Sequence, residues 1–170
     1  VAVDKTGTLT EGKPVMTDFQ VLEGFNEQQV LQLIASVEAK SEHPIAYAIV
    51  QAAKEQQIEL IEVSEFDSIT GAGIKAQINN QDIQIGAERL MQQLGLNTEH
   101  FAGIASKLGQ EGKTPLYAAL DGKLAAIIAV ADPIKDTSFK AIEELHRQGL
   151  KVAMITGDNP HTANAVAQQL

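Results

Sequence analysis

The chain has 170 residues, which suffices for one domain or two small ones, and its 44% hydrophobic content allows a packed core. Thirteen basic residues against 22 acidic ones give a formal net charge of −9, which argues against a nucleic-acid or anionic-lipid surface. Cysteine is absent, so disulfide bonds and cysteine-ligated metal sites are excluded. The longest apolar run, residues 124–131, is too short to span a bilayer. Because the chain starts in an apolar run without Met and stops within a helical pattern, we expect a piece of a longer protein.

A string of polar residues, Asp-Lys-Thr-Gly-Thr-Leu-Thr at residues 4–10, follows the apolar run at residues 1–3. The apolar run predicts the buried end of a parallel strand, which would place Asp4 at the carboxyl edge of the sheet, where open α/β sheets bind ligands. Gly7 allows a tight turn, and the hydroxyl and N–H groups of residues 6–8 can face a phosphoryl group. Asp4 is therefore a candidate nucleophile that would form an aspartyl phosphate.

The middle of the chain predicts helices and antiparallel strands. A helix is expected over residues 27–40 with Asn26 as its N-cap, and Pro44 suits the first position of a second helix, which places His43 at a helix entrance. Hairpin turns and alternating apolar residues favour antiparallel pairing further on. The remaining expected elements are strands at 63–66, 74–78, 83–85, 116–120 and 123–130 and helices at 87–94 and 98–108.

The last forty residues return to βαβ-type wiring. A helix is expected over residues 137–148, a strand over 151–155 and a further helix from Pro160. Between the last strand and helix stand Thr156, Gly157 and Asp158, whose hydroxyl and N–H groups would lie at the same sheet edge as Asp4 and hold phosphate oxygens. An α/β domain interrupted by an α+β insertion with an antiparallel sheet is therefore predicted.

The string at residues 4–10 is similar to the phosphorylation motif of P-type ATPases. The resemblance implies a haloacid-dehalogenase-like, Rossmann-type phosphorylation (P) domain, here incomplete, at residues 1–18 and 131–170, interrupted by a nucleotide-binding (N) domain at residues 19–130. It also implies ATP and Mg²⁺, with the Asp4 carboxylate and the Thr6 carbonyl as a partial Mg²⁺ site. The catalytic residues carried over on this resemblance are Asp4, Lys5, Thr6, Thr156, Gly157 and Asp158.

Within the insertion, Glu38 and the Ser-Glu-His-Pro string at residues 41–44 resemble the signature of the heavy-metal-transporting subfamily. An imidazole at a helix entrance can stack on or hydrogen-bond a purine, and glycines let a nucleotide approach the backbone. This chain departs from the family at Ala87, where Asn is usual. The resemblance favours a copper exporter over zinc or cadmium exporters. The implied ATP-binding residues are Glu38, His43, Gly71, Gly73 and Gly86.

The resemblance also implies what surrounds this region. It predicts the cytoplasmic domain of an integral membrane protein that hydrolyses ATP to move metal ions, with the membrane helices, the actuator domain and the rest of the P domain as partners. Asp132, Pro133 and Lys135 match the family's hinge motif near the triphosphate. The family's downstream GDGxND segment and phosphate-site Lys do not occur before Leu170, so we expect this piece to bind ATP without full turnover.

Two alternatives remain open on the sequence: a haloacid-dehalogenase-type phosphatase with a cap domain, and a non-catalytic nucleotide-binding module. Phosphatases of this type place a second Asp two residues after the nucleophile as a general acid and base. This chain has Thr6 at that position, and a hydroxyl cannot relay protons near neutral pH as a carboxylate does. A long-lived aspartyl phosphate, and therefore a pump, is favoured.

Overall fold

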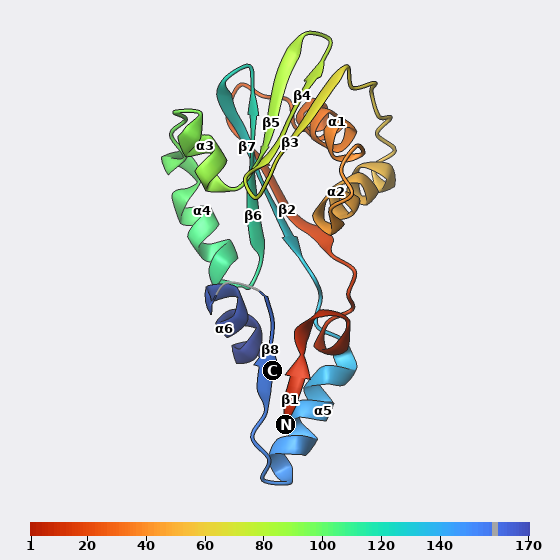
Figure 1. Cartoon of the computed structure of the whole chain (residues 1–170), viewed down its shortest axis with the longest axis vertical. Helices are drawn as coiled ribbons and strands as arrows, with labels where there is room; N and C mark the ends of the chain where they lie inside the picture. Colours follow the sequence, from red (N-terminus) through yellow and green to blue (C-terminus); the bar gives the residue numbers. More distant parts are fainter. Residues whose placement is uncertain (158–159) are drawn as a thin grey trace.

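The chain folds around two sheets of opposite character (Figure 1). A computed structural model describes residues 1–157 and 160–170, and of residues 160 and 161 it describes the backbone only. One sheet pairs two parallel strands, β1 (Ala2–Asp4) and β8 (Ala153–Ile155). The other has six strands in the order β2-β7-β6-β5-β4-β3, with all neighbours antiparallel. The predicted change from parallel to antiparallel pairing along the chain is confirmed.

The six-stranded sheet contains both predicted hairpins, β4 with β5 and β6 with β7. The strand expected at residues 63–66 lies further along, because pairing with β4 begins only where the Ser64 N–H donates to the Gln77 carbonyl at 2.9 Å. The strands of this sheet are β2 (Val15–Val21), β3 (Glu65–Ile69), β4 (Gly73–Ile78), β5 (Gln81–Gly86), β6 (Thr114–Leu120) and β7 (Lys123–Ala131).

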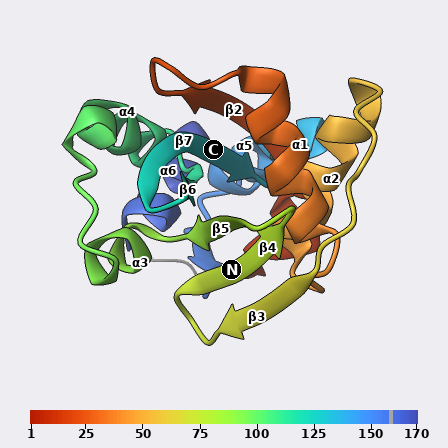
Figure 2. The same cartoon turned by 90° about the horizontal axis from the view of Figure 1, so that it is seen from above.

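Helices cover both faces of this sheet (Figure 2). On one face lie α1 (Glu27–Glu38) and α2 (Pro44–Glu55), and on the other lie α3 (Glu88–Gln93) and α4 (Glu99–Gln110). The predicted caps are confirmed: the Asn26 side chain accepts a hydrogen bond from the Gln29 N–H at 3.0 Å, and Pro44 is the first residue of α2.

Strand β7 explains the apolar run in the sequence. Because successive side chains of a strand point to opposite faces, Ile128 and Val130 join the core under α1 and α2, whereas Ile127 and Ala129 join the core under α3 and α4. The strand is therefore buried on both faces from residue 124 to 130. Within the described part of the chain, no helix has the length and apolar character that crossing a bilayer requires.

The parallel sheet differs from the expectation in its burial. The register pairs Asp4 with Ile155, as the βαβ-type wiring requires, and helices α5 (Asp136–Arg147) and α6 (Pro160–Gln169) complete this part of the molecule. Neither strand is buried: Ala2 and Asp4 of β1 are exposed, as is Ile155 of β8 at 59%, and Val1 just before β1 is 56% exposed. Two strands alone offer few neighbours among the described residues, so apolar side chains stay accessible. Strand β8 is also shorter than predicted.

The two sheets are joined by β2 and β7, which lie side by side and pair as far as Val15 with Ala131. The predicted domain limits at residues 18 and 130 fall inside these strands. The division into two domains therefore stays a prediction, with a paired ribbon of two strands as the connection.

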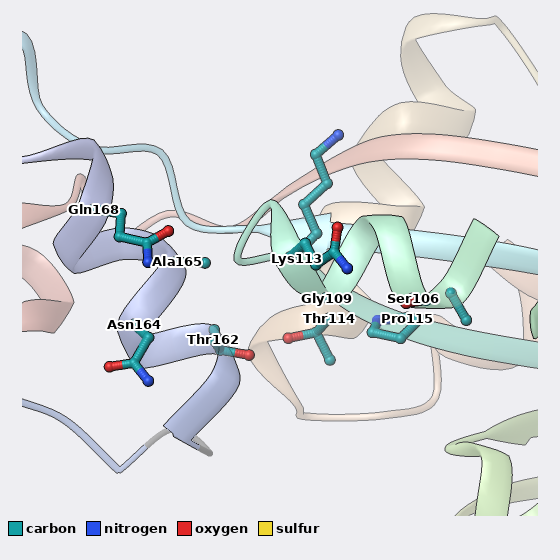
Figure 3. A pocket seen from close by; sticks show the side chains of 11 residues that line it. Ser106, Gly109, Lys113, Thr114, Pro115, Thr162, Asn164, Ala165 and Gln168 are labelled. Carbon is teal, nitrogen blue, oxygen red and sulfur yellow. The ribbon is translucent and has the colours of Figure 1, made fainter. Parts of the chain in front are cut away.

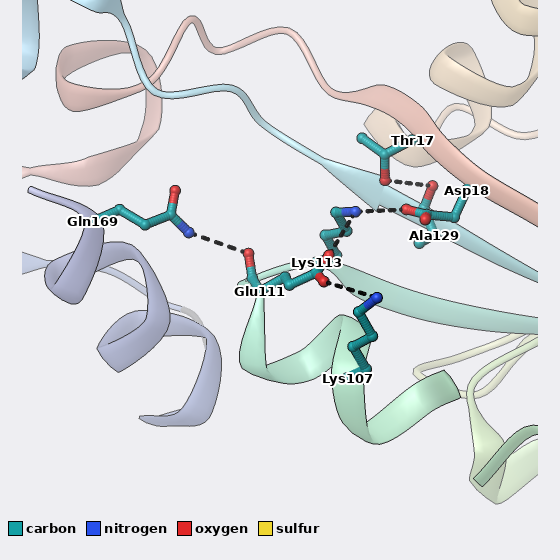
Figure 4. A network of polar contacts seen from close by, with 7 residues as sticks. All are labelled: Thr17, Asp18, Lys107, Glu111, Lys113, Ala129 and Gln169. Carbon is teal, nitrogen blue, oxygen red and sulfur yellow. Dashed lines mark hydrogen bonds and ion pairs between the residues drawn. The ribbon is translucent and has the colours of Figure 1, made fainter. Parts of the chain in front are cut away.

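A polar network links β2 to the α4–β6 turn and to α6 (Figure 4). The register of β2 shifts between Met16 and Asp18, which is a bulge, and Asp18 follows it. The Lys113 Nζ lies 2.8 Å from Asp18 Oδ2 and 2.8 Å from Glu111 Oε2. The Gln169 side chain of α6 donates to the Glu111 carbonyl at 3.3 Å. The network therefore contacts both parts of the molecule.

A cavity of about 690 Å³ lies where α4 and β6 meet α6 (Figure 3). Its walls include the polar side chains of Ser106, Thr114, Thr162, Asn164 and Gln168. None of the described residues predicted for catalysis or nucleotide binding lines this cavity. The candidate sites therefore lie elsewhere.

Candidate functional site

Asp4 is the last residue of β1, and the chain turns sharply after it through the segment η1 (Lys5–Leu9), in which Thr6 and Gly7 have non-helical backbone angles. Gly7 has φ +75°, a backbone conformation that side chains rarely adopt, so the tight turn predicted at this position is confirmed. Asp4, Thr6 and Thr8 are exposed. A carboxylate and two hydroxyl-bearing residues are thus accessible to a ligand at the carboxyl edge of the parallel strand.

The turn is held from behind by Thr10, which is fully buried. Its hydroxyl lies 2.5 Å from Asp132 Oδ2 and 3.0 Å from the Lys5 carbonyl, and it accepts a hydrogen bond from the Gly7 N–H at 3.3 Å. The second carboxylate oxygen of Asp132 accepts from the Lys13 N–H at 3.1 Å. Asp132 therefore fixes the conformation of the loop that carries Asp4.

Two further side chains hold the same turn. The Lys135 Nζ donates to the Gly7 carbonyl at 2.6 Å, and the buried Ser138 hydroxyl donates to the Leu9 carbonyl at 2.8 Å. Sequence reasoning singled out Lys135 through the family's hinge motif but missed Ser138 and Thr10. No local pattern marks Ser138, whose partner lies 129 positions away, and the bond of Thr10 to Asp132 spans 122 positions, although Thr10 itself closes the string at residues 4–10.

Thr156 and Gly157 follow β8 directly, and β8 pairs with β1 so that Ile155 is opposite Asp4. The structure thus brings these two residues to the sheet edge that carries Asp4, as predicted. Space around Gly157 is open, since a Cβ there would meet no heavy atom within 4 Å among the described residues. Asp158, the third predicted residue of this group, lies outside the described residues.

The second candidate site is a pocket of about 300 Å³ between α2 and the strands β4 and β5. Apolar side chains of Ile74, Ile85 and Leu116 form part of its wall. All five residues predicted to bind ATP line it, although they span positions 38 to 86: Glu38, His43, Gly71, Gly73 and Gly86.

His43 caps α2 at the mouth of this pocket. Its Nδ1 accepts a hydrogen bond from the Ile45 N–H at 3.2 Å, and its N–H donates to the Ser41 hydroxyl at 3.3 Å. The bond from Ile45 requires a lone pair on Nδ1, which leaves Nε2 to carry the proton of the neutral imidazole. The ring is exposed, so its face and its Nε2–H are available to a ligand.

Gly73 and Gly86 stand opposite each other in β4 and β5, where the backbones come too close for any side chain. A Cβ on Gly73 would lie 2.1 Å from the Ile85 carbonyl oxygen, and one on Gly86 would lie 2.3 Å from the Ala72 carbonyl oxygen. Both would also meet Leu90. These glycines are therefore required by the fold itself, in addition to any contact with a nucleotide.

Ala87, at the position where Asn is usual in the resembling family, is tied through its backbone. Its N–H donates to the Ala72 carbonyl at 3.1 Å, and its side chain gives α3 no cap. The close approach of the two chain segments is thus preserved without the amide side chain.

Glu38 provides the buried charge of the pocket. It is the last residue of α1 and only 6% exposed. Burial raises the pKa of its carboxyl group from the ordinary 4.5 to about 7, because the ionised form loses hydration. Near neutral pH the group can therefore either donate or accept a hydrogen bond inside the pocket.

A family model described as haloacid dehalogenase-like hydrolase matches residues 1–170. The chain belongs to this family. Copper-transporting ATPase 1 of Rhizobium meliloti (strain 1021) is 52% identical over 170 residues, which cover 100% of this chain and 21% of that protein. The chain thus spans about a fifth of the length of this curated relative. The expected resemblance to P-type ATPases is confirmed.

Solved structures agree with this placement in the family. A zinc-transporting PIB-type ATPase in the E2.Pi state matches with a TM-score of 0.83 and 34% identity, over 99% of this chain and 27% of that chain. The N-domain of HMA8, a copper-transporting P-type ATPase, matches with a TM-score of 0.58 and 25% identity, over 69% of this chain and 99% of that one. The predicted fold class is confirmed.

Gly86→Ala tests the backbone crossing of this haloacid dehalogenase-like chain. The added Cβ must displace the backbone, so we expect the free energy of unfolding to fall by roughly 2–3 kcal/mol in urea titrations followed by circular dichroism. Gly103→Ala in α4 is the matched control, since a Cβ there meets nothing within 4 Å and removing a helical glycine gains up to about 1 kcal/mol. Equal effects of the two substitutions would contradict the steric requirement.

Glu38 makes stability depend on pH. Because its pKa is raised on folding, the folded chain retains a proton that the unfolded chain releases between pH 4.5 and about 7. This stabilisation is complete below pH 4.5 and is lost as the pH rises through about 7. We expect the free energy of unfolding to fall by about 2–3 kcal/mol more in the wild type than in Glu38→Gln between pH 5 and pH 8. Glu42→Gln, which changes an exposed carboxylate, is the control, and parallel pH curves for the wild type and Glu38→Gln would refute the assignment.

Proposed function

We propose that this chain is the ATP-binding and phosphoryl-accepting region of a heavy-metal-transporting P-type ATPase, with copper as the transported ion. The observation that carries the proposal is the convergence of Glu38, His43 and three glycines on one pocket. Support also comes from the relative named as a copper-transporting ATPase.

The pocket suits a nucleobase in size and chemistry. Its volume of about 300 Å³ lies at the lower end of the range of small-molecule sites. Apolar side chains offer flat contact to a purine, and the buried Glu38 carboxyl group supplies one polar group that can read its edge. His43 at the mouth can stack on the ring or donate from Nε2.

At the other site, the proposed chemistry is phosphoryl transfer to Asp4. A carboxylate oxygen of Asp4 forms a bond to the γ-phosphorus of ATP while the bond from that phosphorus to the bridging oxygen of ADP breaks. Thr156 and Gly157 would hold phosphate oxygens from the neighbouring strand, and Lys5 would add positive charge.

Mg²⁺ fits the oxygen donors at this edge, since the exposed Asp4 carboxylate and the Thr6 carbonyl are hard ligands. When bound, it neutralises phosphate charge. The described residues contain no group of three or more His, Cys, Asp or Glu side chains that could hold a metal ion, so Asp4 and Thr6 would form only part of the coordination shell.

The proposal extends to the intact transporter. It divides the chain into a P domain, residues 1–18 and 131–170, and an N domain, residues 19–130. It places both on the cytoplasmic side of a membrane protein, joined to membrane helices, an actuator domain and the rest of the P domain. There, hydrolysis of ATP would drive the export of metal ions.

A phosphatase with a cap domain is the second candidate, because the matching family model is described as a hydrolase. This alternative predicts that the full-length protein releases phosphate from small phosphomonoesters over many turnovers. Thr6, exposed two residues after Asp4, lacks the acid–base capacity for this reaction.

His43→Ala tests the nucleotide site. Loss of ring contacts should weaken ATP binding by the 170-residue chain at least about fivefold, measured by isothermal titration calorimetry. His100→Ala, which removes an exposed imidazole from α4, should leave the affinity unchanged. If ATP binds equally well to both variants, the adenine-site assignment is wrong.

Asp4→Asn tests the nucleophile in the full-length transporter. The wild type should acquire an acid-stable, hydroxylamine-labile label from γ-labelled ATP, whereas the amide of the variant cannot attack phosphorus. Asp121→Asn changes a carboxylate in the β6–β7 turn and should keep the label. A label that persists in Asp4→Asn would exclude the proposed acceptor.

A further inference from the structure

Arg89 lies against the glycine turn at the rim of the nucleotide pocket. Gly71, an exposed residue with φ +68° in the turn between β3 and β4, lines the pocket, and a Cβ placed on it would lie 3.1 Å from the Arg89 Nη2. The guanidinium group of α3 therefore covers this turn from outside the cavity. Arg89 is exposed and forms no hydrogen bond or ion pair with any residue that the structure describes.

The phosphates of a nucleotide bound in this pocket would need a positive charge nearby, and the walls of the pocket, in the part of the chain that the structure describes, provide none. Among the described residues that line it, none is Lys or Arg, and its one acid is Glu38. The whole chain carries a formal net charge of −9, which repels a polyphosphate. A guanidinium group at the rim, with its five N–H donors, is therefore suited to compensate phosphate charge locally.

The direction of a bound nucleotide follows from burial. Glu38, at 6% exposure, marks the inner end of the pocket, and the exposed Gly71 and His43 mark its mouth. A base that fills the apolar interior leaves its phosphates at the mouth. In Figure 1 the turn between β3 and β4 lies at the lower ends of these two strands, on the side of β1, the strand that carries Asp4.

We propose that Arg89 binds the phosphate chain of the nucleotide where it leaves the pocket, and that this contact makes the pocket prefer nucleotides over nucleosides. The inference rests on the proposed function, which it deepens. None of the five residues that the family resemblance assigns to this site is Lys or Arg, so Arg89 would supply the phosphate contact that they lack.

The test compares ATP and adenosine binding to the 170-residue chain by NMR titration, which measures millimolar as well as micromolar affinities. Arg89→Ala should weaken ATP binding about five- to tenfold and leave adenosine binding unchanged, and Arg89→Lys should recover part of the loss. The control is Arg147→Ala, which removes the chain's other arginine from an exposed pair with Glu144 and should change neither affinity.

The outcomes separate this assignment from the proposed function. The proposed contact of Arg89 with phosphate would be wrong if Arg89→Ala left ATP affinity unchanged, or if it weakened ATP and adenosine binding equally. Neither result would contradict the nucleotide site itself. Equal effects would instead indicate that Arg89 only packs on the turn. If the wild-type chain bound neither ATP nor adenosine, the proposed function would fall and this assignment with it.

Discussion

The buried hydroxyl of Thr10 is the interaction on which the arrangement of the molecule depends. It joins the turn after Asp4 to Asp132, so that one group connects the start of the chain with the segment that follows the inserted sheet. Backbone bonds add to this contact, since Glu11 N–H donates to the Pro133 carbonyl and Lys135 N–H to the Leu9 carbonyl. The loop that presents Asp4 and the two connections to the inserted sheet are therefore parts of one hydrogen-bonded unit.

The two candidate sites differ in how far they are exposed to solvent. The loop after Asp4 is accessible and is shaped from behind by buried hydrogen bonds, so its reactive groups need no apolar enclosure. The pocket in the inserted part lies between strands and α2, and burial there raises the pKa of the Glu38 carboxyl group to about 7. In the proposed function, nucleotide recognition and phosphoryl transfer would therefore occupy two separate surfaces, one enclosed and one open.

Local signals in the sequence predicted most of the elements, and the described residues assigned to each candidate site by resemblance lie together in the structure. Asn26 and Pro44 mark helix starts through backbone chemistry that acts within three residues, and the residues at positions 4–10 define a turn by themselves. Features that depend on how the strands pair could not be predicted from the sequence. The contact of Gly73 with Gly86 needs the pairing of β4 with β5, and the exposure of the first strand depends on how many strands the parallel sheet contains.

The paired ribbon of β2 and β7 determines how the inserted part can move. Cross-strand hydrogen bonds keep the two strands from sliding past each other, whereas bending out of the plane of the ribbon breaks none of them. The bulge at the start of β2 is a local point of added twist, and the ion pair of Lys113 with Asp18 ties the strand at this point to the α4–β6 turn. The connection therefore resists sliding of one strand along the other, and the hydrogen bond from Gln169 of α6 to the Glu111 carbonyl restrains its bending as well.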